Sequence, residues 1–358
     1  MSILFILVGI SVLILAHELG HFLIAKLFGL RVEEFGFGFP PRLWSKQIGE
    51  TKYSLNWLPF GGFVRIYGEH GELLGRANLL KREGADEAAA MAGQAARDPR
   101  SFAAQSILRR VAIVAAGVVM NFLLGWLLIS FIFMIGVPKT VLVSNVMADS
   151  PASVGGIMSG DILKDYSASP DFISFIDKNR GKEVSLTILR GEEELELALI
   201  PRLKTPDGEG PLGVVLSDTG VDRHSIFGSL SEGFKQAIAT IGMIFKSLYG
   251  LLLTLFAEGK VLDGFVGPVG IFGIANQAGS LGVLYLVQLL ALISLNLAVL
   301  NVLPFPALDG GRLLFLLIEK IKGSPIAPER EAFANALGFG FLLLLMIAVT
   351  VRDIVILF

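Results

Sequence analysis

The sequence predicts a polytopic α-helical membrane protein with four transmembrane helices and one inserted α+β domain. The chain has 358 residues, of which 53% are hydrophobic and 17% charged, and its mean hydropathy is +0.67. A soluble domain carries about 45 to 50% apolar and about 25% charged residues, so this composition indicates an integral membrane protein. The apolar residues also gather into runs of about 20, the length that crosses a hydrocarbon core. Residues 138–205 instead show short alternating strands, which predicts a separate folded domain.

The first span is expected at residues 2–28, an apolar run interrupted only by His17, Glu18, His21 and Lys26. A cleaved signal peptide is the alternative interpretation of this run. The run lacks a basic n-region and an Ala-x-Ala-like cleavage site, and its ionisable cluster lies where an apolar core should continue. These features favour a transmembrane helix.

Three further spans are expected at residues 111–137, 283–303 and 333–358. Residues 227–257 form another apolar stretch, but one glutamate and two lysines interrupt it. Such a pattern is typical of a helix that lies in the membrane interface or is partly embedded. We therefore expect four spans rather than five.

Basic residues predict the orientation, because lysine and arginine near spans prefer the cytoplasmic side. Residues 31–110 carry twelve of them, whereas none precedes Lys26. Residues 31–106 are therefore expected on the cytoplasmic face, and residues 138–226 on the opposite face.

Charge and cysteine content exclude several classes of protein. The 30 basic and 32 acidic residues give a net charge of −2, so no basic field predicts a nucleic-acid partner. The chain has no cysteine, which excludes disulfides, thiolate metal sites and cysteine nucleophiles. Any metal is therefore expected to bind to histidine, aspartate or glutamate.

An H-E-x-x-H motif lies within the first span, at His17, Glu18 and His21. Residues four apart share a helix face, so both imidazoles can bind one Zn²⁺ while Glu18 acts on water at the metal. The alternative is a pair of hydrogen-bonded histidines on a polar face. Inside a membrane, ionisable groups cost several kcal/mol unless they are paired or metal-bound, which favours the metal site.

A catalytic zinc ion takes a third protein ligand and leaves one position open. Asp309 is the best candidate, because the third span ends there in a proline-interrupted turn and paired glycines follow. Depth in the membrane agrees with this assignment. The first span carries His17 and His21 past its midpoint toward the cytoplasmic side, and the third span delivers Asp309 to the same side.

Several motifs in the same order along the chain resemble the site-2 proteases, a family of intramembrane zinc metalloproteases, and within it the bacterial regulator-of-sigma-factor branch. The resemblance covers nearly the whole chain. It is carried by H-E-L-G-H at 17–21, G-F-G-F at 36–39, L-P-F-G-G-F-V at 58–64, G-P-V-G-I at 267–271 and L-D-G at 308–310.

The resemblance implies that His17, His21 and Asp309 bind Zn²⁺ and that Glu18 is the general base. It also implies that two asparagines of the third span hold the unwound substrate. These residues are Asn296 and Asn301. For both asparagines, hydrogen bonding between helices remains the alternative role.

The family also implies a membrane-associated β-loop, which matches the alternating pattern of residues 36–66; a plain cytosolic hairpin is the alternative. The inserted domain, residues 138–205, resembles a PDZ domain, which binds extended peptides by adding a strand to a sheet edge. A spacer role is the alternative. The remaining parts are expected to be an N-terminal membrane part (1–137), a linker (206–226) and a C-terminal membrane part (227–358).

The expected function is hydrolysis of a peptide bond within or near the transmembrane segment of single-pass membrane proteins, such as an anti-sigma factor or a signal-peptide remnant. The lipid bilayer is the other expected partner, and a substrate's outer portion is expected at the PDZ domain. The resemblance places the protein in the cytoplasmic (inner) membrane, with the PDZ domain on the extracytoplasmic side. The alternative is a catalytically silent scaffold that binds partners through this domain.

Overall fold

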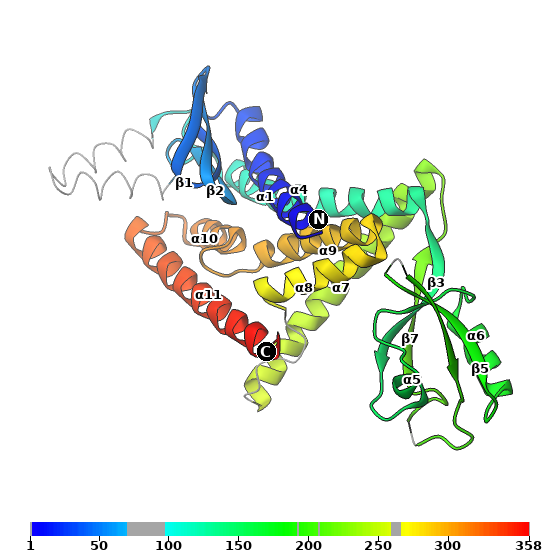
Figure 1. Ribbon diagram of the computed structural model, residues 1–358. Helices are drawn as coiled ribbons and strands as arrows, with labels where there is room; N and C mark the ends of the chain where they lie inside the picture. Colours follow the sequence, from blue (N-terminus) through cyan, green and yellow to red (C-terminus); the bar gives the residue numbers. More distant parts are fainter. Residues whose placement is uncertain (1, 70–96, 192, 207, 259–265, 358) are drawn as a thin grey trace.

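The computed structural model describes residues 2–69, 97–191, 193–206, 208–258 and 266–357 (Figure 1). Within these residues, four helices are long and apolar enough to cross a membrane, as the sequence predicts. They are α1 (Ser2–Leu27), α4 (Ile107–Ile135), α9 (Val283–Val302) and α11 (Pro328–Leu357). Many of their large apolar side chains are exposed, as expected where lipid covers them.

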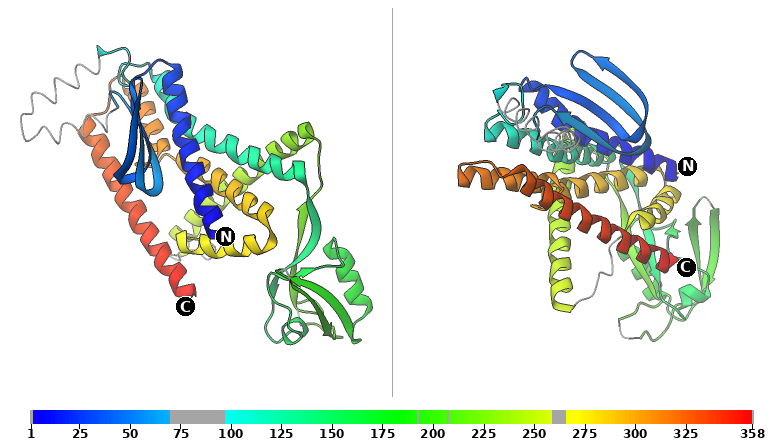
Figure 2. Two further views of the ribbon diagram at one scale, coloured as in Figure 1. Left: turned by 45° about the horizontal axis from the view of Figure 1, so that its top comes forward. Right: turned by 90° about the vertical axis from the view of Figure 1, so that its left-hand side faces the viewer.

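Helices α1 and α4 approach each other closely. A Cβ atom on Gly20 of α1 would lie 2.4 Å from the Ala116 carbonyl oxygen of α4, so only glycine allows this crossing. Helix α9 packs against α4 on another side and has a largely buried face that includes Leu290, Ala291 and Leu295. These three helices form the centre of the membrane part (Figures 1 and 2).

The predicted β-loop is a hairpin of β1 (Val32–Ile48) and β2 (Thr51–Ile66) that packs beside α1. The strand β2 folds back on itself, so that Phe35 of β1 is paired with Tyr53 on one side and with Val64 on the other. The first half of β1 is therefore central, and residues 62–66 form an edge. Among the described residues, this edge segment has no second strand partner.

The inserted domain has its own core and stands apart from the helices (Figure 1). Its five-stranded antiparallel sheet has the order β6-β5-β4-β3-β7, with two helices beside it. Its elements are β3 (Val137–Val146), α5 (Pro151–Val154), β4 (Ile162–Leu163), α6 (Ser169–Lys178), β5 (Val184–Arg190), β6 (Glu193–Leu199) and β7 (Val214–Val221).

Strand β7 corrects the predicted linker. The prediction assigned residues 206–226 to a linker, but residues 214–221 pair with β3 along its length, from Val146 opposite Val214 to Val137 opposite Val221. Turn-forming residues precede this strand and polar residues lie within it, so the sequence pattern does not predict a strand here. Its partner strand β3 lies earlier in the chain, on the far side of three other strands and two helices, so β7 becomes recognisable only when the sheet closes.

The C-terminal part contains three further helices, α7 (Ile226–Glu258), α8 (Pro268–Leu281) and α10 (Asp309–Lys322). The predicted amphipathic helix at 227–257 corresponds to α7, which is not among the four candidate spans of the described chain. It packs across α4, where Trp126 Nε1 donates to the Leu230 carbonyl oxygen. The sequence analysis did not anticipate α8 or α10.

Candidate metal centre

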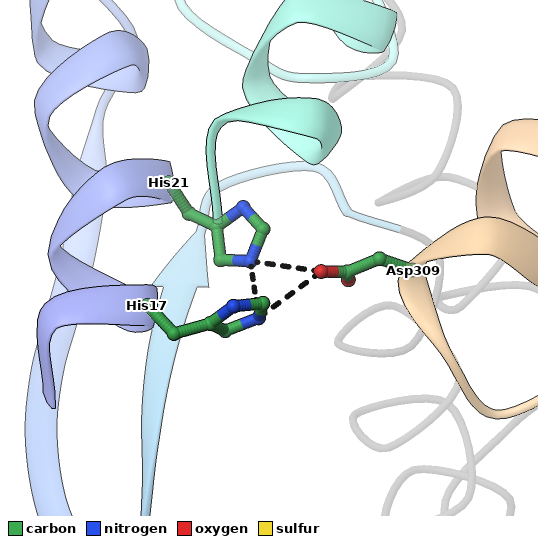
Figure 3. A group of neighbouring side chains, drawn as sticks. All are labelled: His17, His21 and Asp309. Carbon is green, nitrogen blue, oxygen red and sulfur yellow. Dashed lines mark hydrogen bonds and ion pairs between the residues drawn. The ribbon is translucent and has the colours of Figure 1, made fainter. Parts of the chain in front are cut away.

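Two histidines of α1 face one point. His17 and His21 lie one helical turn apart, and their Nε2 atoms are 3.2 Å from each other (Figure 3). His21 is buried and His17 is half-buried. This is the arrangement that the four-residue spacing predicts.

Asp309 reaches the same point from the first turn of α10. Its Oδ2 atom lies 3.1 Å from His17 Nε2 and 3.3 Å from His21 Nε2 (Figure 3). The glycines that follow Asp309 allow this approach. A Cβ atom on Gly310 would lie 2.0 Å from the Leu303 carbonyl oxygen, and a Cβ atom on Gly311 would lie 2.3 Å from the Phe305 carbonyl oxygen. Helix α10 therefore begins directly against the loop that ends α9.

The loop before Asp309 is held by α11. Ala307 has a left-handed backbone conformation, with φ of 73°, and its N–H donates to Asn335 Oδ1 at 2.9 Å. A Cβ atom on Gly338, one turn further along α11, would lie 2.5 Å from the Pro306 carbonyl oxygen. Asn335 and Gly338 thus fix the backbone that presents Asp309.

The three side chains fit a metal ion. Their ligand atoms lie within 4.8 Å of one another, and Asp309 Oδ2 is buried without a hydrogen-bond donor. His21 Nδ1 lies 2.9 Å from the Ile113 carbonyl oxygen, so this nitrogen carries the proton and Nε2 turns a lone pair toward the cluster. Two imidazole nitrogens and one carboxylate oxygen are a donor set that zinc accepts.

Asn121 of α4 orients the other histidine. Its side-chain amide lies 3.1 Å from His17 Nδ1, and its Oδ1 atom is buried without a partner. A half-turn of the amide group about its terminal bond exchanges the nitrogen and the oxygen, so either atom can face His17 Nδ1. With the oxygen facing the ring, Oδ1 accepts the Nδ1 proton of His17, which leaves Nε2 free for a metal, and the amide nitrogen takes the other, buried position.

Gly117 of α4 makes room for both rings. A Cβ atom at this position would lie 2.5 Å from His21 Nε2 and 2.7 Å from His17 Cε1. The sequence analysis did not single out Gly117, Asn121 or Asn335 as site residues. An asparagine inside a span is a signal that would have indicated Asn121, whereas Gly117 and Asn335 become recognisable only from their contacts.

Glu18 lies against the hairpin, and the two predicted asparagines lie on α9. A Cβ atom on Gly62 would lie 2.9 Å from Glu18 Cγ, so the glutamate lies against the edge segment 62–66 of the hairpin. Asn296 Nδ2 donates to the Leu292 carbonyl oxygen of its own helix. Asn301 is half-buried in the last turn of α9.

Comparison with known proteins identifies relatives of the whole chain. The profile of peptidase family M50 matches residues 5–345. A putative zinc metalloprotease of Clostridium perfringens is 34% identical over 360 residues, which cover 99% of each chain. The regulator of sigma-W protease RasP of Bacillus subtilis is 29% identical over 407 aligned positions, covering 96% of this chain and 95% of RasP. A putative zinc metalloprotease of a Nostoc species is 32% identical over 374 positions, with 99% and 96% covered.

Proposed function

Since the chain belongs to peptidase family M50 and is a multi-pass membrane zinc metalloprotease, we propose that it cleaves single-pass membrane proteins within or near their transmembrane segments. The observation that carries the proposal is the convergence of His17, His21 and Asp309 from helices at opposite ends of the chain. One of these helices, α1, is itself a candidate span, which supports a metal site at membrane depth.

In this proposal His17, His21 and Asp309 hold the zinc ion. The bound ion supplies Lewis-acid polarisation of a peptide carbonyl and activation of water. Glu18, next to the first histidine, accepts the proton of the attacking water and passes it to the leaving amine. The Asn121 amide and the Ile113 carbonyl oxygen keep both imidazoles in the required orientation.

A helical substrate must unwind first, because its carbonyl groups are engaged in backbone hydrogen bonds. The edge segment 62–66 lies beside Glu18 and offers strand pairing to an extended substrate. From α9, the side chains of Asn296 and Asn301 would replace further backbone hydrogen bonds that the unwound substrate has lost.

The hairpin also exposes Trp44 and Trp57, with 56% and 64% of their surface accessible, and tryptophan favours the membrane interface. We therefore assign the hairpin to the membrane surface.

The inserted domain, in this proposal, is a PDZ domain on the extracytoplasmic side of the cytoplasmic membrane. The clustered basic residues of 31–110 support that orientation. The domain would bind or filter the outer portion of the substrate. RasP is named for the regulation of sigma-W, which supports an anti-sigma factor as substrate class; a signal-peptide remnant has the same single-span chemistry.

The test is cleavage of a panel of single-pass membrane peptides by the purified protein in bilayers. Glu18→Gln keeps the side-chain shape and leaves the three zinc ligands in place, and it should lower turnover by about 10² to 10⁴-fold. Glu232→Gln, in an exposed pair with Lys235 on α7, is the matched control and should cleave normally. Equal activity of Glu18→Gln and wild type would contradict the proposed role of Glu18.

The metal assignment has an independent test. Asp309→Ala should lower the zinc content of the purified protein, measured by elemental analysis, because two histidines alone hold zinc weakly. Full zinc occupancy in this variant would show that another residue is the third ligand.

A further inference from the structure

A cavity of about 570 Å³ lies between the inserted domain and the membrane helices. It is lined by residues of β3 and β7, the last turns of α4, part of α7, the end of α8 and the first half of α9. All views place the inserted domain at this end of the bundle, away from the β1–β2 hairpin (Figures 1 and 2). The cavity is therefore on the side where the substrate's outer portion would lie.

The lining of the cavity suits a polypeptide segment. Most of it is apolar, and Gln236, Thr240 and Gln288 add neutral hydrogen-bonding groups. No lysine or arginine is among the lining residues, so the cavity lacks the cation that an anionic lipid headgroup requires. Asp218 is the one charged residue of the lining that the structure describes, and its carboxylate already accepts hydrogen bonds from the backbone N–H and hydroxyl of Ser169. Uncharged amides beside apolar walls match the backbone and side chains of a peptide.

One wall of the cavity is an edge strand. Residues 218–221 of β7 line it, and β7 is one of the two edge strands of the sheet. Among the described residues, β7 is paired with β3 alone, so one of its sides offers backbone groups to a further extended segment. A peptide that has lost its helical hydrogen bonds can recover some of them here.

The floor of the cavity leads toward the metal centre. Tyr285, Gln288 and Leu292 lie at helical spacing on α9 and all line the cavity. Asn296 follows one turn later, and its amide donates to Leu292. On the neighbouring face of this turn, the hydroxyl of Ser294 donates to the carbonyl oxygen of Asn121, the residue that orients His17. Helix α9 thus connects the cavity, through two adjoining faces, to the residue that orients His17.

We propose that this cavity binds the outer juxtamembrane segment of the substrate in a non-helical form and directs the adjoining membrane segment along α9 to the metal centre. This inference rests on the proposed function, and it adds a binding site that is distinct from the metal cluster. Holding the outer segment extended would favour unwinding of the adjoining helical turns, because helix formation is cooperative.

The absence of cysteine from the sequence permits a direct test by cross-linking. Gln288→Cys and Gln236→Cys are introduced singly into the Glu18→Gln protein; both side chains are exposed within the cavity and come from different helices. A single cysteine is moved along the outer juxtamembrane segment of a peptide that the wild type cleaves. Ser185→Cys, exposed on β5 and outside the cavity, is the matched control.

Both cavity cysteines should cross-link to a short window of outer substrate positions, at least about tenfold more than Ser185→Cys does, because binding raises the local thiol concentration. Cross-linking no stronger than that of Ser185→Cys, with a substrate that the wild type cleaves, would overturn the inference and leave the proposed function intact. If the wild type cleaves no peptide of the panel, the same scan is made with an uncleaved single-pass peptide, and cross-linking of its outer segment to both cavity cysteines would support the cavity and count against the proposed function.

A second measurement separates peptide from lipid. In the wild-type background, a bulky maleimide on Gln288→Cys should raise KM for substrates with an outer segment and leave peptides truncated at the membrane surface unaffected. If lipid alone blocks labelling of Gln288→Cys and added substrate changes nothing, the cavity is a lipid site and the inference is wrong.

Discussion

Replacing Gly117 by alanine introduces one methyl group at the point where α4 faces both histidines. The new Cβ atom would lie 2.5 Å from His21 Nε2, and ordinary contact begins at 3.4 Å, so the ring must move by about 0.9 Å or α4 must retreat. Metal sites tolerate deviations of about 0.2 Å in ligand distance. The required movement is several times larger than this tolerance. The new Cβ atom would also lie 2.7 Å from His17 Cε1, so the second histidine must move as well.

We expect Gly117→Ala to weaken zinc binding by about 10 to 100-fold, the usual effect of disturbing the support of metal ligands. It should also lower kcat/KM by about 100-fold, since displacements near 1 Å cost that much in catalysis. Zinc affinity is measured by competition with a chromogenic chelator, and the site geometry by the visible spectrum of the Co²⁺-substituted protein.

Gly125→Ala is the matched control, because it adds the same methyl group to the same helix two turns away. There the Cβ atom would lie 2.7 Å from the buried Leu295 side chain and 3.3 Å from the Ala291 carbonyl oxygen, so the substitution crowds the contact between α4 and α9 without touching either histidine. This variant should keep wild-type zinc affinity. If Gly117→Ala binds zinc and cleaves substrate as the wild type does, the close packing of α4 on the histidines does not constrain the site.

Substitutions at three other positions test the surroundings of the site and the inserted domain. Asn121→Leu should weaken zinc binding by about tenfold in chelator competition, because His17 loses its hydrogen-bond partner; unchanged affinity would exclude that role. Asn335→Leu should also reduce zinc affinity, whereas Asn335→Asp keeps an acceptor for the Ala307 N–H and should restore most of it; equal loss in both would indicate a packing effect. Asp161→Ala removes a buried carboxylate that pairs with an arginine and should destabilise the inserted domain by about 2 to 4 kcal/mol in denaturant unfolding; a change below about 0.5 kcal/mol would refute this.

The sequence alone predicts the membrane architecture and the metal-binding pattern, because both depend on local regularities. A run of about 20 apolar residues forms a helix across lipid whatever surrounds it, since the backbone has no other hydrogen-bond partners there. The four-residue spacing of His17 and His21 likewise gives one helix face before any tertiary contact exists. The position of Asp309 follows from counting spans, and in the structure its carboxylate lies beside both histidines.

Other features depend on partners that are distant in the chain, and only the tertiary structure decides them. The segment predicted as a linker includes β7 because it pairs with β3. Gly117 lies at the site because α4 crosses α1 with its backbone nearly in contact, and Asn335 supports the Asp309 loop from the last membrane helix. Local spacing in the sequence carries no signal for such contacts, since they form only when separate helices and strands pack against one another.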